Sequence, residues 1–135
     1  MEKVNLEQAK KEVNKWLDFK KVDVEKRDEN IESIEAIAKS ISTGYLVLDK
    51  DHNLIQELKF PMEDEDGNVV MSQLKFKPRL KMGEIQNKTQ NLKAGDTFAL
   101  ITGYICALTN INSGLIKQLD SEDYKIAQSV VIFFL

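Results

Sequence analysis

The chain has 135 residues, of which 42% are hydrophobic and 30% charged, and its formal net charge is −3. These values are typical of one ordinary domain that needs no disulfide or metal to fold, and such a mild charge favours no nucleic-acid partner. No segment reaches the roughly 18–20 consecutive apolar residues that span a bilayer, and the first residues lack the apolar segment of a signal peptide. The single cysteine, Cys106, forms no internal disulfide, so we expect a cytoplasmic protein without a membrane partner.

Residues 5–43 are predicted to form a helical hairpin. Apolar side chains recur at helical spacing over 5–19 and again over 26–42, and Gly44 is a suitable residue to end the second helix. The two stripes consist of Ala9, Val13, Trp16 and Leu17, and of Ile31, Ile34, Ile37, Ala38 and Ile41. Because neither helix is long enough to be stable alone, residues 1–44 are expected to be an extension that covers itself, the main domain or a partner.

Residues 45–77 predict a small antiparallel β-meander of about three strands. Short β-branched or alternating runs are separated by polar turns, and Asp66-Gly67 is a strong signal for a hairpin turn. Pro61 limits the second strand to an edge or an end, because proline has no N–H for a central ladder. We find no internal repeat.

Residues 81–135 predict a helical cap over this sheet. A weak helix over 81–92 contains Gly83, and a buried helix over 97–109 contains Gly103, which suggests the close approach of another backbone. A short helix over 113–119 comes next. The last helix is expected to run from Ser121 to the chain end. The fold class is therefore α+β, with residues 45–135 as the main domain.

The start of that last helix carries a capping signal. Asp120 is expected to be the N-cap, with Asp123 at the third helical position, and Leu119 is placed to pack on Tyr124.

No catalytic or metal-binding constellation is found, so we expect no enzyme activity and no cofactor. The pattern Asp49-x-Asp51-x-Asn53 resembles the start of a calcium loop, but the sixth and twelfth positions are not the glycine and glutamate that such a loop needs. One histidine, His52, and one cysteine do not make a zinc set or a nucleophilic pair, and Cys106 is predicted to be a small core residue.

Two charged clusters are predicted to be solvated surface. The acidic run of residues 63–66 lies on a hairpin loop, with a docking patch for a basic partner as the alternative. A basic cluster follows it, and for that cluster the alternative is contact with a phosphate backbone. Its members are Lys75, Lys77, Arg79, Lys81, Lys88 and Lys93.

Residues 130–135 form a run of six apolar side chains at the C-terminal end of the sequence. On a helix they point all round the axis, whereas one contact with the core covers a single stripe. Either the final helix is buried in a groove, or part of this surface meets another chain.

From Leu58 onward, the chain resembles phage tail assembly chaperones of the E type, from long-tailed phages and Mu-like prophages. The resemblance covers roughly residues 55–135, and Asn110 stands where that family usually has a glycine at a helix end. The matching pieces are Leu58-Lys-Phe-Pro61, Asp66-Gly67, Leu74-Lys-Phe-Lys-Pro-Arg79, Ala107-Leu-Thr-Asn110, Leu119-Asp-Ser-Glu-Asp-Tyr124 and Phe133-Phe-Leu135.

This resemblance implies a protein that binds the helical tape measure protein, assists tail tube assembly in the host cytoplasm and is absent from the mature virion. The tail tube protein and a second copy of the chain are further expected partners. The alternatives are a structural tail component that stays in the virion, or a small protein-interaction domain with another role. The expected partner-binding residues are Tyr104, Tyr124, Val130, Val131, Phe133, Phe134 and Leu135.

Overall fold

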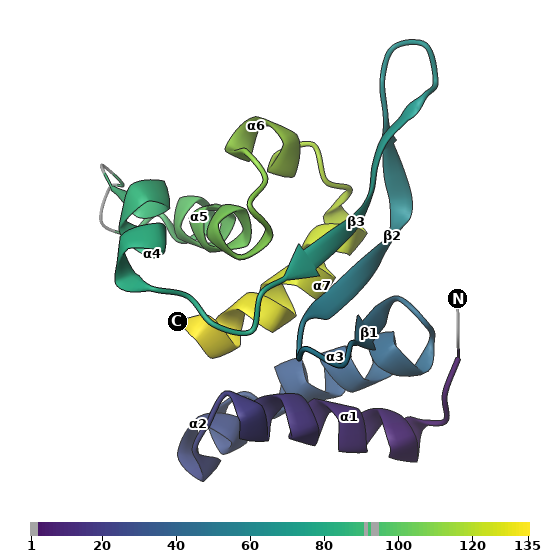
Figure 1. Cartoon of the computed structure of the whole chain (residues 1–135), viewed down its shortest axis with the longest axis vertical. Helices are drawn as coiled ribbons and strands as arrows, with labels where there is room; N and C mark the ends of the chain where they lie inside the picture. The colour runs from purple at the N-terminus through teal and green to yellow at the C-terminus, as the bar shows by residue number, and fades with distance from the viewer. Residues whose placement is uncertain (1–2, 91, 93–94) are drawn as a thin grey trace.

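The structure is a computed structural model that describes residues 3–90, 92 and 95–135. Over these residues it contains seven α-helices, one 3-10 helix and one three-stranded antiparallel sheet (Figure 1). The predicted α+β class is therefore confirmed. None of the described helices combines the length and the apolar character needed to cross a membrane.

The N-terminal hairpin forms as predicted, but its second arm is divided. Helix α1 spans Leu6–Phe19, α2 spans Val24–Glu29 and α3 spans Ile31–Ser42. We predicted one helix over 26–42. The helix starts earlier because the Asp23 side chain accepts a hydrogen bond from the backbone N–H of Lys26. It breaks at Asn30, whose side-chain amide donates to the Lys26 carbonyl at 2.8 Å and competes with the helical ladder.

The sheet is the predicted meander, with the strands in the order β1-β2-β3. Strand β1 spans Leu46–Leu48, β2 spans Leu54–Glu63 and β3 spans Val69–Phe76. Pro61 was expected at an edge or an end of the second strand, and β2 continues past it to Glu63, beyond the three residues that pair with β1. Strand β2 contains a large bulge, because the register moves from Glu57 opposite Gln73 to Met62 opposite Met71. Pro61 lies inside this bulge, where no ladder N–H is required.

The two turns of the meander have the same construction, a repeat that our sequence analysis missed. In the first turn, Asp49 Oδ1 accepts hydrogen bonds from the backbone N–H groups of Asp51 and Asn53, each at 2.9 Å. In the second turn, Asp64 Oδ1 accepts from Asp66 and Asn68, again at 2.9 Å. The fourth residue of each turn is left-handed, with φ of 66° at His52 and 82° at Gly67.

The C-terminal helices follow the predicted order with shifted ends. Helix α4 spans Met82–Thr89, α5 spans Thr97–Thr109, α6 spans Ser113–Ile116 and α7 spans Ser121–Val131. Asn110 adopts φ 58° after α5, so it takes the left-handed position that glycine often occupies at a helix end. The last helix was predicted to reach the chain end, but the α-helix stops at Val131 and a 3-10 turn spans Ile132–Phe134.

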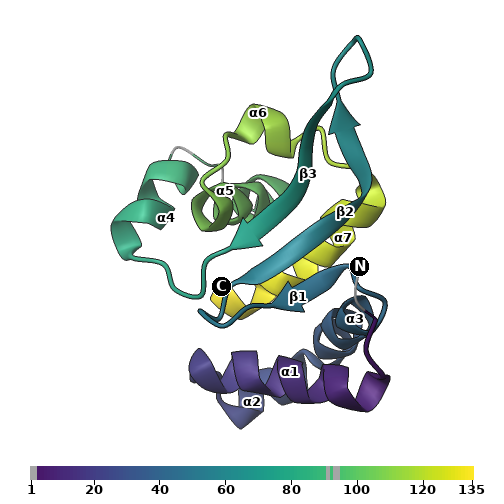
Figure 2. The same ribbon diagram turned by 45° about the vertical axis from the view of Figure 1, so that its right-hand side comes forward.

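Helix α7 lies across one face of the sheet, and the N-terminal helices lie beyond the β1 edge (Figure 2). One hydrophobic cluster includes side chains from α1, α3, all three strands, α5 and α7. The Trp16 ring of α1 meets the Phe133 ring edge to face, with centroids 5.8 Å apart. The described part of the predicted extension, residues 3–44, therefore shares one hydrophobic core with the sheet and the C-terminal helices.

Candidate interaction surface

Three of the seven predicted partner-binding residues are core residues. Val130 and Val131 have no exposed surface, and the Phe133 side chain is 4% exposed. The prediction that they form a contact surface is therefore wrong. The physical reason is that the inner side of α7 is covered by β2, α3 and α5, while Trp16 of α1 covers Phe133.

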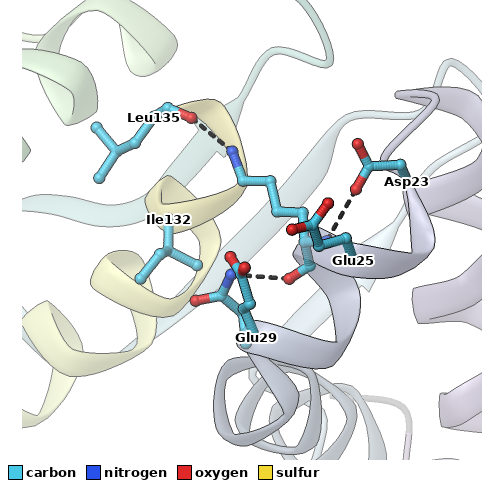
Figure 3. A pocket seen from close by; sticks show the side chains of 7 residues that line it. Asp23, Glu25, Glu29, Ile132 and Leu135 are labelled. Atoms are coloured by element: carbon cyan, nitrogen blue, oxygen red, sulfur yellow. Dashed lines mark hydrogen bonds between the residues drawn. The ribbon is translucent and has the colours of Figure 1, made fainter.

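The last two residues are covered to different extents. Phe134 is half-buried, with the Lys20 Nζ 3.3 Å from its ring centroid, and Leu135 is 47% exposed. Lys26 Nζ donates to the Leu135 carbonyl oxygen across an open hollow of about 430 Å³ between α2 and the 3-10 turn (Figure 3). Asp23 lines this hollow, but its carboxylate is already bound to the start of α2.

The two remaining predicted residues, Tyr104 and Tyr124, are half-buried. Burial raises the pKa of Tyr124, and its hydroxyl has no hydrogen-bond partner among the described residues. The Tyr124 ring packs against Phe98 of α5, with centroids 5.9 Å apart. Phe98 is 73% exposed, and our prediction of partner-binding residues omitted it.

Asp123 joins the start of α7 to the bulge of β2. Its two carboxylate oxygens accept backbone hydrogen bonds from Lys59 at 2.8 Å and from Phe60 at 3.0 Å. Its carbonyl oxygen accepts a third bond from the side chain of the buried Gln56 at 2.9 Å. The predicted capping role of Asp123 is therefore replaced by a contact with β2, whereas Asp120 caps α7 as expected.

Two aromatic rings meet at the first turn of α7, and a third belongs to a β2 residue whose backbone is bonded to that turn. Tyr124 belongs to that turn, Phe98 touches Tyr124, and the backbone of Phe60 is bound to Asp123. The Phe60 side chain is 55% exposed. We refer to Phe60, Phe98 and Tyr124 as the aromatic junction. Each ring was visible in the sequence, but no sequence pattern placed the three together.

The remaining candidate residues, Cys106 and His52, both pack within the fold. Among the described residues, no three histidine, cysteine or acidic side chains are placed to hold a metal ion. Cys106 is 1% exposed and burial raises the pKa of its thiol, which is the environment of the core residue we predicted. His52 stacks on Phe19, with ring centroids 3.9 Å apart.

The charged clusters lie at the surface. The acidic run of residues 63–66 is exposed at the hairpin turn, and in the basic cluster Lys77 forms an ion pair with Glu84 at 3.2 Å. The other described members, Lys75, Arg79, Lys81 and Lys88, are exposed. Lys93 lies outside the described residues.

Comparison with known proteins found no match to this chain. No family model, no curated protein and no solved structure matches the chain.

Proposed function

We propose that this protein is a phage or prophage tail assembly chaperone that binds the helical tape measure protein and assists tail tube assembly. The observation that carries the proposal is the aromatic junction, where the 73% exposed Phe98 packs on Tyr124 and the backbone of the 55% exposed Phe60 is bonded to the neighbouring Asp123. Large exposed rings on ordered elements are typical of the anchor residues in protein interfaces.

The contact at Asp123 supports the proposal in a second way. Two motifs of the family resemblance, residues 58–61 and 119–124, lie far apart in the sequence, and the bonds from Asp123 to Lys59 and Phe60 bring them together. The motif at 119–124 therefore fixes the position of the motif at 58–61, which gives the two motifs a common structural role. That role is to hold the aromatic junction in place.

The chemistry of this surface suits an amphipathic helical client. Aromatic rings cover the apolar stripe of a long helix without much loss of side-chain entropy, as in helix-in-groove recognition. The exposed acidic turn of residues 63–66 ends the same β2–β3 hairpin and attracts basic residues that flank such a stripe. The protein would act in the host cytoplasm and leave before the particle is complete.

Binding to the tape measure protein of the same phage or prophage tests this proposal. We expect Phe98→Glu and Phe60→Glu to weaken co-purification of the two proteins by at least about tenfold, because a charge replaces an anchoring ring. Val24→Glu is the matched control, since Val24 is 72% exposed and lies on α2, an element that contributes nothing to the junction. Binding that is unchanged in both junction variants would contradict the placement.

Mass spectrometry of purified particles separates the proposed role from that of a structural tail component. A chaperone should be absent from the particles but present in the lysate. Stoichiometric recovery from the particles would favour the structural role.

A further inference from the structure

The tip of the β2–β3 hairpin contains Asp66-Gly67, the one Asp-Gly pair in a sequence that has no Asn-Gly pair. Residues 63–70 are all exposed, and the hairpin projects away from the helices (Figures 1 and 2). Asp66 is bonded into the turn through its backbone N–H, whereas its carboxylate forms no ion pair among the described residues. A Cβ at Gly67 would meet nothing within 4 Å. The carboxyl group and the peptide bond that follows it therefore lie at an exposed, uncrowded position.

We propose that Asp66 is a site of covalent self-modification, where the turn converts aspartate into isoaspartate through a cyclic imide. The backbone nitrogen of Gly67 attacks Asp66 Cγ and a C–N bond forms. One carboxyl oxygen leaves as water, with the amide proton and one proton from the solvent. Water then adds to one of the two imide carbonyls, and a proton returns to the solvent. Cleavage of the new C–N bond restores aspartate, whereas cleavage of the original peptide bond leaves the main chain running through Cγ.

The first turn of the meander provides an internal comparison, because Asp51 precedes His52 as Asp66 precedes Gly67. The two turns hold the attacking nitrogen in the same way. The N–H groups of His52 and Gly67 each donate to the carbonyl of the residue three positions earlier, at 3.2 Å and 3.0 Å. However, the side chain of His52 shields its nitrogen, and its ring stacks on Phe19 of α1. Glycine has neither restriction, so Asp66 is the reactive member of the pair.

The hydrogen bond from the Gly67 N–H has to open before the nitrogen can attack. The β2–β3 ladder beneath the tip is irregular, because its register shifts twice between Glu57 and Glu63. A hairpin end that is separated from the regular ladder opens more readily than the rest of the sheet. The Asp64 carboxylate opposes this opening by accepting two backbone N–H groups of the turn, each at 2.9 Å. The bonds to Asp64 therefore limit the rate of the reaction.

Isoaspartate changes the shape of the turn and keeps its charge. The modified residue adds one atom to the main chain between the backbone nitrogens of Asp66 and Asn68, and it still carries one free carboxylate. In the unmodified turn, Asp64 Oδ1 accepts from both of these nitrogens. The longer chain moves them apart, so one of the two bonds is lost. The reaction thus distinguishes an aged chain from a new one at the end of the hairpin.

Peptide mapping of the full chain tests the proposal, with samples taken over weeks at physiological temperature and neutral pH. Isoaspartate has the same mass as aspartate, so it is identified by retention, by fragmentation, and by methyl transfer from S-adenosylmethionine with an isoaspartyl methyltransferase. We expect isoaspartate to accumulate at residue 66 at least about tenfold faster than at residue 51, because glycine leaves the nitrogen unshielded. No isoaspartate at residue 66, or equal rates in the two turns, would overturn the proposal.

Two variants test the parts of the turn separately. Gly67→His gives the second turn the residue of the first, and it should slow the reaction at Asp66 at least about tenfold. Asp64→Ala releases the turn and should accelerate the reaction about threefold or more. The matched control is Glu65→Gln, which removes an exposed carboxylate of the same turn and should leave the rate unchanged. An unchanged rate in Gly67→His, or a rate in Asp64→Ala no higher than in the control, contradicts the mechanism.

Discussion

The carboxylate of Asp123 lies 2.8 Å from the backbone nitrogen of Lys59, 64 residues away in the sequence. This bond and the neighbouring one to Phe60 satisfy two N–H groups that the bulge of β2 removes from the sheet ladder. The Asp123 residue is fully buried, and its loss would leave these two N–H groups without their protein partner. The position of the aromatic junction depends on this contact.

We therefore expect Asp123→Ala to lower the free energy of unfolding by about 2–4 kcal/mol, because two backbone donors lose a charged and buried acceptor. Asp123→Asn should cost less, since one amide oxygen remains as an acceptor. Urea unfolding measures both changes. Glu122→Gln removes a charge from the same turn at an exposed position and is the control. Equal effects of Asp123→Asn and Glu122→Gln would show that the contact contributes nothing.

Substitution of two glycines should have opposite effects. A Cβ at Gly103 would lie 2.8 Å from the Lys88 carbonyl oxygen and 2.8 Å from Thr89 Cγ2. Gly103→Ala should therefore destabilise the fold by about 1–3 kcal/mol, because α4 has to move away from α5. A Cβ at Gly83 meets nothing within 4 Å, so Gly83→Ala should stabilise by about 0.5 kcal/mol through helix propensity. Thermal unfolding measures both variants. If the unfolding temperatures of Gly103→Ala and Gly83→Ala changed in the same direction, the close contact of Gly103 with α4 would be contradicted.

The first turn of the meander should tolerate glycine better than alanine at His52. His52 has φ 66°, and its ring stacks on Phe19 at an interplanar angle of 7°. Both His52→Ala and His52→Gly lose the stack, but only glycine removes the strain of the left-handed backbone. We expect His52→Gly to be more stable than His52→Ala by about 1 kcal/mol in urea unfolding. The reverse order would mean that the strain is negligible.

Stability should rise with pH above about 8 through Lys20. Burial, Arg79 and Lys26 lower the pKa of Lys20 from 10.5 to about 8, whereas its cation–π contact with Phe134 favours the charged form. We expect burial and the two cations to prevail. Between pH 8 and 10.5 the unfolded chain then holds a proton that the folded chain has lost, so the folded state gains stability as pH increases.

The variant Lys20→Met should remove this dependence, because it keeps the length of the side chain without its charge. Since Lys20 remains partly exposed, we expect only about 1 kcal/mol of difference between the two pH profiles. Urea midpoints measured from pH 7.5 to about 10.5 provide the comparison. Parallel profiles for the parent and the variant would contradict the lowered pKa.

Local patterns were sufficient for much of the architecture. The helical stripe of Trp16 and the cap at Asp120 were predicted from neighbouring residues, and both are present. The family resemblance placed Asn110 where a glycine usually ends a helix, and Asn110 is left-handed. The prediction of close backbone approach at Gly103 is confirmed as well. The stripe and the caps depend on interactions within a few residues of the same segment, whereas Gly103 was recognised because a glycine inside a buried helix is unusual unless another backbone lies close.

The candidate site was predicted only in part. Tyr124 was selected, but Phe60 and Phe98 were missed, and Val130 and Val131 were placed on a surface although they are buried. An apolar residue on a helix has the same sequence signature whether it faces the core or a partner. The side that is covered depends on which other elements pack against it.

By itself, the amino-acid sequence determined the α+β class, the order of the elements and their capping residues, because spacing, caps and turns are local properties. Only the tertiary structure decided that Asp123 binds β2, that Phe133 lies against Trp16, and that β3 is the last strand of the sheet. These relationships join segments that are distant in the chain. They arise because the folded chain has to cover its apolar surface and satisfy its buried backbone groups at the same time.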